Sequence, residues 1–503
     1  MKAINAPACL LAALLTSATY ASSAQQTVIF SNIAGEPSSQ IPGGVGTWDA
    51  DFSFFTLNIS TSGEHWLFNH QASGGFPEVL VAGSGTTGSV VLQEGLNQLN
   101  GRIVEGIDSS GRINNSGAWV VAGDFSGATS DDDFVVSGDL SGVNMLLAQE
   151  GSAIPDSIFG AGNTYDTLQT TAIDQSGLIY HEADSLDGPA FGSDDNEAII
   201  RSDGVVLLRT ATDIPTNQGG GTARTYQGFD LDDFHVSDDG SSWLVRGDFD
   251  GSSADDDALF VDGMTVIQEG FTLSDIGILN AESLTAVVDN LTGGIDQQFM
   301  AGNGDWYAFG QVADGNDTDW AIRNGAVIAR SGDEIFPGAG ESWDDPASGI
   351  QDFSLLVGNS LGDYVLGGLT SQGDVVVVLN GAEVVLRSGD AVDLDGDGTS
   401  DDAFIGSFEF QETRLGDNLM LFALVNLDNA SGADIGSAFI TVDLAACPAD
   451  LAEPLGTLNF FDIAEYIALF NAGDPVADFA APFGAINFFD IAEYINQFNA
   501  GCP

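Results

Sequence analysis

Aspartates at alternating positions in one loop are the strongest candidates for chemistry in this chain. Asp393, Asp395, Asp397 and Asp401 surround a glycine. Acids at the first, third and fifth positions of such a loop converge on a hard cation, the glycine permits the sharp turn, and the ninth position adds a ligand. The spacing predicts a calcium site, and a solvated Asp/Gly turn between two repeats is the alternative.

Weaker acidic loops recur along the chain and are expected at equivalent rim positions of a repeated structure. They fall near residues 124–133, 187–196, 248–257 and 314–319. Either each loop binds a cation, or Asp starts the turns and keeps the rim hydrated. We favour the second interpretation.

No arrangement typical of a catalytic centre stands out. The sequence contains no Gly-x-Ser-x-Gly or His-Glu-x-x-His motif and no phosphate-binding loop. His65 and His181 fall in or beside a recurring strand, and their convergence at one channel mouth would favour an enzyme. We assign no catalytic residue, and keep a polysaccharide-degrading enzyme as the alternative function.

The acidic loops recur within a sequence repeat of 53 to 64 residues. Each copy has a glycine followed by an aromatic or aliphatic strand, as in Gly63…Trp66, Gly117…Trp119 and Gly240…Trp243. An alternating segment precedes the glycine, and two further strands follow, joined by turns such as Asn324-Gly325 that need positive φ. Four short antiparallel strands in each of seven copies predict an all-β fold, a seven-bladed β-propeller. A β-sandwich pair or a solenoid is the rival architecture.

The seventh copy lacks its fourth strand, and an N-terminal strand near 27–33 has no partners of its own. We therefore expect that this strand completes the last sheet and closes the ring, which removes an exposed edge. The predicted domains are a secretory signal peptide at 1–24, the propeller at 25–445 and a C-terminal module at 446–503. The apolar run of the signal is too short to span a membrane, and no transmembrane segment is expected after it.

Charge and cysteine content agree with export. Without Lys2 the chain has ten arginines against 74 acids, a net charge of −64. Such a surface repels nucleic acid and anionic lipid, and suits calcium or a saline habitat. Cys447 and Cys502 remain after the signal is removed, and one bridge between them is the simplest pairing in an oxidising compartment.

The C-terminal module contains the same nine-residue sequence twice. Asn-Phe-Phe-Asp-Ile-Ala-Glu-Tyr-Ile occupies 459–467 and 487–495. The apolar positions predict two helices, at 461–471 and 489–499. Tyr466 and Tyr494 occupy matching positions, and we expect them to contact a partner. A terminal cap whose helices pack only on each other is the alternative.

This module resembles the dockerin-like, GC-type anchoring domains at the C-termini of secreted bacterial proteins. The resemblance covers about 57 residues and includes the final Gly501-Cys502. It implies two calcium-loop-plus-helix units and a cohesin-like or cell-envelope partner protein. The implied calcium ligands are Asp450, Asn459, Asp462, Asp478, Asn487 and Asp490. Positions 1, 3 and 5 of both loops lack the ligands of the dockerin pattern, so calcium is the weaker part of the resemblance.

We therefore expect a protein that is secreted, extracellular or attached to a cell surface, with a non-catalytic propeller that binds an unidentified ligand and a dockerin-like module that tethers it. A structural surface-layer component is a third class.

Overall fold

The computed structural model describes residues 25–49, 57–73, 77–108, 111–127, 130–155, 158, 162–168, 171–184, 197–219, 223–250, 255–289, 297–314, 318–344, 353–395, 402–444, 449, 451–452, 458–472, 475–477, 479 and 486–500. One compact unit lies within Ala24–Leu444, and the C-terminal unit, here called the tail, begins at Ala445. Within the described ranges, no helix is both long and apolar enough to cross a membrane.

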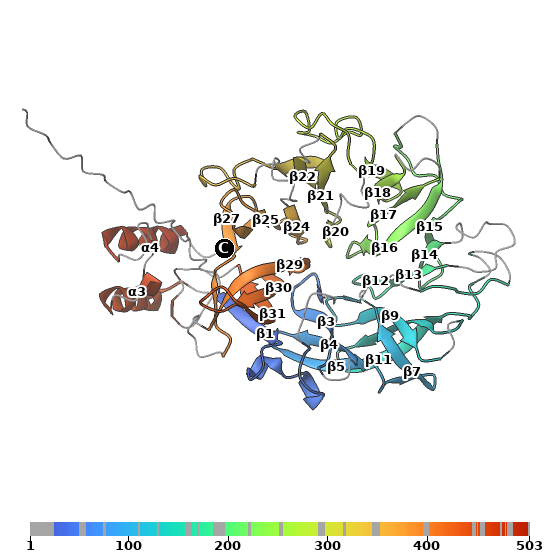
Figure 1. Cartoon of the computed structure of the whole chain (residues 1–503), viewed down its shortest axis with the longest axis horizontal. Coiled ribbons are helices and arrows are strands. Elements are labelled where there is room, and N and C mark those ends of the chain that lie inside the picture. Colours follow the sequence, from blue (N-terminus) through green and yellow to red (C-terminus); the bar gives the residue numbers. More distant parts are fainter. Residues whose placement is uncertain are drawn as a thin grey trace, which may run out of the picture. The chain divides into compact units, whose positions relative to one another are not determined.

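The first unit consists of antiparallel sheets set around a common centre (Figure 1). Sheet 1 contains β2 (Leu57–Ile59), β3 (His65–Gln71), β4 (Glu78–Ser84) and β5 (Thr87–Gln93). Sheet 2 contains β6 (Gln98–Leu99), β7 (Arg102–Ile107), β8 (Arg112–Ile113), β9 (Trp119–Phe125), β10 (Asp133–Asp139) and β11 (Gly142–Gln149). Sheet 3 contains β12 (Thr171–Ile173), β13 (Ile179–Ala183), β14 (Ala198–Arg201) and β15 (Val206–Arg209).

The chain continues in the same way. Sheet 4 contains β16 (Tyr226–Val236), β17 (Trp243–Phe249), β18 (Asp257–Val261) and β19 (Met264–Gln268). Sheet 5 contains β20 (Gln297–Met300), β21 (Trp306–Val312), β22 (Thr318–Arg323) and β23 (Ala326–Arg330). Sheet 6 contains β24 (Phe353–Gly358), β25 (Tyr364–Leu369), β26 (Val375–Leu379) and β27 (Glu383–Arg387). The prediction of an all-β propeller arrangement is confirmed by this strand order.

Sheet 7 joins the two ends of the unit. It contains β28 (Ala391–Val392), β29 (Ala403–Leu415), β30 (Met420–Asp428), β31 (Asp434–Asp443) and, on the far side of β31, β1 (Gln25–Ser31). Gln25 lies opposite Asp443, and Ser31 lies opposite Ala438. The N-terminal strand therefore completes the last sheet, as its orphan position in the sequence predicted.

The recurring glycine marks one tight turn that is repeated in each sheet. A backbone hydrogen bond runs from its N–H to the carbonyl oxygen three residues earlier, as from Gly63 to Ser60 and from Gly240 to Ser237. Six of these positions are glycines with φ between 67° and 95°. The seventh is Leu419, which bonds to Gly416 with a φ of 58°. Since positive φ is costly for a side chain such as leucine, tertiary packing must hold this last turn in place.

Core clusters lie between neighbouring sheets. Phe30 and Phe439 of sheet 7 pack with Trp66 and Phe68 of sheet 1, with ring centroids 5.5 Å apart for Phe30 and Trp66. Trp66 is fully buried, and its indole N–H donates to the carbonyl of Gly85. Truncating such a side chain costs about 3–5 kcal/mol, so these aromatic residues carry much of the adhesion between sheets.

The tail contains α3 (Phe460–Ala472) and α4 (Phe488–Ala500), with the short η4 (Pro475–Ala477) between them. Both predicted helices are confirmed. Their common core is formed by Ala449, Tyr466, Ala477 and Tyr494.

Candidate functional site

A small cavity lies at the centre of the propeller, lined by one strand from each of the seven sheets. Its volume is about 90 Å³. The lining includes Asn58 of β2, Arg112 of β8, Ala172 of β12, His235 of β16, Phe299 of β20, Gly358 of β24 and Arg414 of β29. A cavity of this size accommodates a few water molecules or a small ion, and is too small for an oligosaccharide.

Cationic side chains gather in this cavity. Arg414 is 9% exposed and donates from Nη1 to the carbonyl of Thr413 at 2.9 Å. Arg112 donates to the carbonyl of Gly111 at 3.1 Å. The His235 ring packs edge-on against Phe299, with centroids 5.3 Å apart. Burial, and then the charges of Arg112 and Arg414, hold the pKa of His235 well below its usual 6.5. Two guanidinium groups and one neutral imidazole therefore line this cavity in a strongly acidic protein.

Hydrogen bonds between the recurring turns surround one end of the cavity. Thr61 donates through its hydroxyl to the carboxylate of Asp238 at 2.5 Å, although these residues belong to sheets 1 and 4. Gln175 of sheet 3 donates to the same carboxylate oxygen at 3.1 Å. The N–H of Asp417 also donates to the carbonyl of Thr61 at 2.8 Å. These contacts join turns of sheets 1, 3, 4 and 7 at this end of the cavity.

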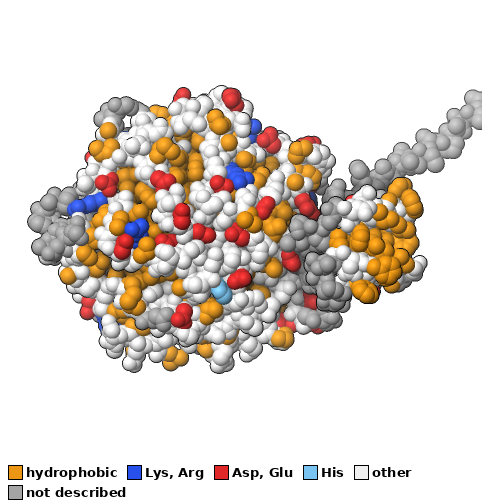
Figure 2. All heavy atoms as spheres, turned by 180° about the vertical axis from the view of Figure 1, so that it is seen from behind, with side chains coloured by type: hydrophobic (Ala, Val, Ile, Leu, Met, Phe, Trp, Pro, Cys, Tyr) orange, Lys and Arg blue, Asp and Glu red, His pale blue; other side chains and the backbone are white. Residues whose placement is uncertain are grey.

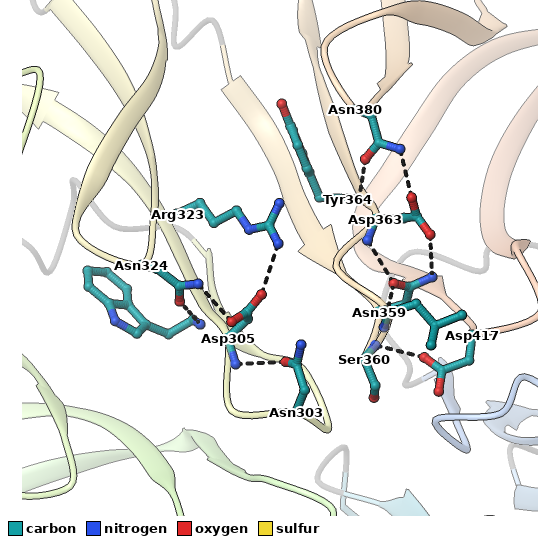
Figure 3. A network of polar contacts seen from close by, with 12 residues as sticks. Asn303, Asp305, Arg323, Asn324, Asn359, Ser360, Asp363, Tyr364, Asn380 and Asp417 are labelled. Carbon is teal, nitrogen blue, oxygen red and sulfur yellow. Dashed lines mark hydrogen bonds and ion pairs between the residues drawn. The ribbon is translucent and has the colours of Figure 1, made fainter.

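Figure 3 shows how the turns of sheets 5 and 6 are held. The Asn324 side chain accepts a bond from the N–H of Trp306 and donates to Asp305 at 2.7 Å. Asn380 makes the same pair of bonds to Tyr364 and Asp363. The side chain of Asp417 accepts from the N–H of Ser360, which links sheet 7 to sheet 6. Asn324 and Asn380 have positive φ, as their hairpin turns require.

A second recurring arrangement lies at the end of the fourth strand of the repeat in sheets 1, 2, 3, 5 and 6. The residue directly after that strand accepts a hydrogen bond from a backbone N–H at the start of the third strand. The acceptor–donor pairs are Glu94 with Glu78, Glu150 with Asp132, Thr210 with Glu197, Ser331 with Asp319 and Ser388 with Val375, at 2.8–3.1 Å. The acceptor is a carboxylate in sheets 1 and 2 and a hydroxyl in sheets 3, 5 and 6. This position therefore has a structural task that either group performs.

In sheet 2, where the acceptor after the fourth strand is Glu150, further carboxylates lie close to it. Oxygens of Asp132, Asp133 and Glu150 lie within 4.8 Å of one another, a spacing that suits a metal ion. Burial, and then the hydrogen bond with Asp124, raise the pKa of Asp133 to about 7. Sheet 4 repeats the pattern: burial and the hydrogen bond with Asp257 raise the pKa of Asp248 to about 7.

Arginines hold the acidic loops of sheets 2 and 4. Arg102 pairs with Asp131 at 3.1 Å and lies over the ring of Phe125. Arg224 pairs with Asp255 at 3.0 Å and lies over the ring of Phe249. Some aspartates of the acidic loops therefore hold these loops in place through ion pairs. This agrees with the interpretation that the loop aspartates have a structural role.

The predicted calcium loop is described in part. Asp393 and Asp395 lie together, whereas Asp397 and Asp401 are outside the described residues. Their neighbour Asp402 completes the cluster within 4.8 Å. Its carboxylate also accepts from the N–H groups of Leu394 and Asp395. Sequence reasoning missed Asp402 because it lies one position beyond the calcium-loop pattern.

The duplicated Asn-Phe-Phe-Asp of the tail is a capping box in both copies. Asn459 accepts from the N–H of Phe461 at 2.8 Å, and Asp462 accepts in return from the N–H of Asn459 at 2.7 Å. Asp462 also accepts from Leu451 and Ala452, and is fully buried. The second copy repeats both bonds, with Phe489 donating to Asn487 and Asn487 donating to Asp490. These contacts give the motif a purpose in helix initiation that needs no cation.

The two tyrosines of the tail lie inside it. Tyr466 is 2% exposed and Tyr494 is 1% exposed, and their rings stack with centroids 3.9 Å apart. The expectation that these tyrosines form the partner-facing surface is corrected by this placement, since matching positions on duplicated helices meet at the pseudo-two-fold axis. The remaining predicted tail residues, Asp450, Asp478, Cys447 and Cys502, lie outside the described residues.

Other apolar side chains of the same helices are exposed. The set consists of Phe460 (74%), Phe461 (63%), Ile467 (52%), Phe488 (74%), Phe489 (64%) and Ile495 (50%). We call these six residues the apolar face. Figure 2 shows apolar side chains covering much of the visible tail surface. The sequence analysis did not single out the paired phenylalanines, which lie in the first turn of each helix.

The cavity residues were also missed, although the repeat contains their signal. Asn58, Arg112, Ala172, His235, Phe299 and Arg414 each stand five positions before the recurring turn residue. Aligning the repeats on that turn would have grouped them. His65 and His181 instead lie in β3 and β13, the second strands of their sheets.

No protein-family model and no curated protein matches this chain. Among solved structures, hydrazine synthase of Kuenenia stuttgartiensis is similar over 78% of this chain and 99% of that one, with 12% identity and a TM-score of 0.38. The Dos1 propeller matches over 78% and 93%, with 7% identity and a TM-score of 0.37. The β-propeller domain of Cps50 (Swd1) from Myceliophteria thermophila matches over 77% and 99%, with 9% identity and a TM-score of 0.34.

Proposed function

We propose that this protein is an exported, non-catalytic binding protein whose propeller is tethered by its tail. The observation that carries the proposal is the apolar face, which exposes four phenylalanines in the first turns of two short helices. A surface of this kind marks an interaction site in a soluble protein. The dockerin-like pattern of the tail supports a docking role.

Charge defines the partner's chemistry. Residues 446–503 contain eight Asp or Glu residues and no Lys or Arg. An acidic surface around an apolar face favours a partner with an apolar patch rimmed by Lys or Arg. We propose a cohesin-like or cell-envelope protein with this surface. A propeller attached in this way is presented outside the cell, in agreement with the signal-like residues 1–24.

For the propeller itself, the proposal is one closed ring in which each of the seven sheets is a blade. The pairing of β1 with β31 and the shared cavity lining support this count. Calcium is proposed at the 393–402 loop and, more weakly, in the tail. A bridge between Cys447 and Cys502 is proposed to stabilise the tail by about 3–4 kcal/mol.

A pull-down with the full chain tests the docking function. The bait is incubated with the cell-surface protein fraction of the source organism, and captured proteins are identified and then purified for binding measurements. Replacing Phe461 and Phe489 by Ser is expected to weaken binding of the captured partner at least tenfold, because two anchors are lost. The control is Leu96→Ser, which alters an exposed apolar residue of the propeller. Equal binding by the double variant and the wild type would contradict a docking role for the apolar face.

Chelator and reductant separate the two stabilising elements proposed for the tail. In the full chain, reductant is expected to lower the melting transition of the tail, whereas chelator leaves it nearly unchanged. A large chelator effect on that transition would show instead that calcium holds the tail.

A further inference from the structure

Four Asn-Gly dipeptides occur in this chain, at 100–101, 303–304, 324–325 and 380–381. The dipeptide is chemically labile, because glycine has no side chain to shield its backbone nitrogen from the preceding amide. That nitrogen attacks Cγ of the asparagine and loses its proton, the bond from Cγ to the amide nitrogen breaks, and ammonia leaves. Water then opens the cyclic imide to aspartate or isoaspartate. The net reaction consumes one water and releases one ammonia.

The attack requires the asparagine side chain to fold back onto its own backbone, so bonds that hold this side chain elsewhere oppose the reaction. Both polar atoms of Asn324 are held at the start of β21 (Figure 3). Its Oδ1 accepts from the N–H of Trp306 at 2.8 Å, and its Nδ2 donates to Asp305 at 2.7 Å. Asn380 makes the equivalent two bonds in sheet 6, at 2.9 and 2.8 Å. Two bonds, one of them to a carboxylate, must therefore break before either side chain can react.

The turn at Asn100, between β6 and β7, lacks this protection. Its φ of 51° is close to the 47° of Asn324 and the 52° of Asn380, so the three turns share a backbone conformation at the asparagine. Within the part of the chain that the structure describes, the Asn100 side chain has no hydrogen-bond partner. Asn303 has one, since its Oδ1 accepts from the N–H of Asp305 at 2.8 Å. All four asparagines are exposed, so they differ in side-chain bonding and not in access to water.

We propose that Asn100 is a site of spontaneous deamidation in the folded propeller, and that hydrogen bonds protect the same dipeptide at Asn324 and Asn380. Asn303, with one bond, reacts at an intermediate rate. Deamidation at Asn100 adds either a negative charge or, as isoaspartate, one backbone carbon to the turn before Arg102. This modification is independent of the docking function proposed for the tail.

Sheet 4 shows what the protection preserves in sheets 5 and 6. Asp262 occupies the position of Asn324. Its carboxylate accepts from the N–H of Trp243 at 2.8 Å and from the hydroxyl of Ser242 at 3.1 Å. The turn therefore accommodates an aspartate where the facing residue is a donor. Asn324 faces Asp305, so an aspartate formed there would lose one bond and bring two carboxylates together.

Peptide mass spectrometry of the full chain after incubation at pH 8 tests the proposal. Asn100 should convert roughly tenfold or more faster than Asn324 and Asn380, because two hydrogen bonds must first break at the latter positions. In urea that unfolds the chain, the three rates should agree within about threefold, because the hydrogen bonds are lost. Equal rates at the three positions in the folded chain would overturn the proposal. Rates at Asn324 and Asn380 that stay low in urea would overturn it as well.

A variant separates hydrogen bonding from other properties of the turn. Asp305→Ala removes the acceptor of the Asn324 amide, and should raise the conversion of Asn324 about three- to tenfold. Asn380 in the same molecule is the control and should remain slow. Asp305 also pairs with Arg323, so folding of the variant is checked by its melting transition. If it does not fold, Asp363→Ala replaces it, with Asn324 as the control. Unchanged conversion beside the substituted acid in a folded variant would exclude protection by these bonds.

Discussion

Sheets 2 and 6 satisfy the same backbone N–H with different residues at the end of the fourth strand, and the charge at that end is negative in sheet 2 and positive in sheet 6. Sheet 2 ends its fourth strand in Gln149-Glu150, and sheet 6 ends its fourth strand in Arg387-Ser388. Glu150 and Ser388 accept equivalent hydrogen bonds from the start of the third strand, at 2.8 and 3.1 Å. The backbone N–H requires an acceptor, but it does not require a negative charge.

The consequences for nearby carboxylates are opposite. In sheet 2, burial and neighbouring acids raise the pKa of Asp133 to about 7. In sheet 6, burial opposes ionisation of Glu341, yet its hydrogen bonds with Arg387 lower its pKa below the usual value. Sheet 2, which ends its fourth strand in Gln149-Glu150, therefore carries negative charge that this hydrogen bond does not need. Sheet 6, which ends in Arg387-Ser388, pairs the positive charge of Arg387 with nearby carboxylates.

The largest expected effect comes from removing the positive charge of sheet 6. Arg387 bonds to Glu341 at 2.7 Å and to Asp374 at 2.8 Å, and the side chains of Arg387 and Glu341 are 11% and 8% exposed. Arg387→Ala is expected to lower the free energy of unfolding by about 3 kcal/mol, because Glu341 is left buried without its partner. Urea denaturation measures this loss. Arg201→Ala, at an exposed pair, should cost less than about 1 kcal/mol, and an equal loss in the two variants would contradict the comparison.

The next effect is a pH dependence that sheets 2 and 4 should dominate. Asp133 and Asp248 have pKa values of about 7 in the folded protein and an ordinary value of 3.8. Between these values the folded state holds more protons than the unfolded state. The free energy of unfolding should therefore fall as pH rises from about 4 through 7, and level off above that.

For each half-buried group we expect a change on the order of 1 kcal/mol after solvent screening. Thermal melts between pH 5 and pH 8 measure it. Asp248→Asn should flatten the slope, whereas an unchanged slope in this variant would assign the pH dependence elsewhere.

Calcium should act mainly at pH 8, where these carboxylates are ionised. We expect millimolar calcium to raise the melting temperature by about 1 °C through Asp132, Asp133 and Glu150, corresponding to about 1 kcal/mol. Asp133→Asn should remove part of the gain. Asp374→Asn in sheet 6 is the control, and an identical calcium response in both variants would rule out the sheet 2 cluster.

The smallest effect tests the hydroxyl acceptor itself. Ser388→Ala removes the bond from the N–H of Val375 and should lower the free energy of unfolding by about 1 kcal/mol, with no change in its pH dependence.

Ser331→Glu in sheet 5 should instead make the free energy of unfolding depend on pH, because it places a carboxylate beside the buried Asp319. Matching urea titrations at pH 5 and pH 8 distinguish the two results.

Repetition made the fold predictable from the sequence. Six of the seven recurring turns have a glycine with positive φ, which side chains rarely adopt, so the spacing of these glycines revealed the turns and hence the sheets. The orphan strand at Gln25–Ser31 could be placed because sheet 7 lacked a strand. The candidate sites were harder to predict. His235 and Arg414 line the same cavity only because the inner strands of distant sheets meet at a common centre. A search for motifs of neighbouring residues does not detect pairs so far apart in the sequence.

The tail shows a different limit. Asn459 and Asp462 have the residue types of a calcium loop, and the same types also form a capping box. Residue identity could not separate these roles, because both depend on oxygen acceptors near a helix start. Likewise, Tyr466 and Tyr494 occupy matching positions in the duplicated sequence, and only the packing shows that both are buried.

The position of β1 also has a mechanical consequence. The tail begins two residues after Asp443, the last residue of β31, and Gln25 of β1 lies directly opposite that residue. Any pull transmitted through the tail therefore enters the propeller at the end of a strand flanked by β1 and β30. Because β31 is hydrogen-bonded on both sides, pulling it out of the sheet would break two antiparallel ladders instead of one. The N-terminal strand thus reinforces the point at which force would be applied to the molecule.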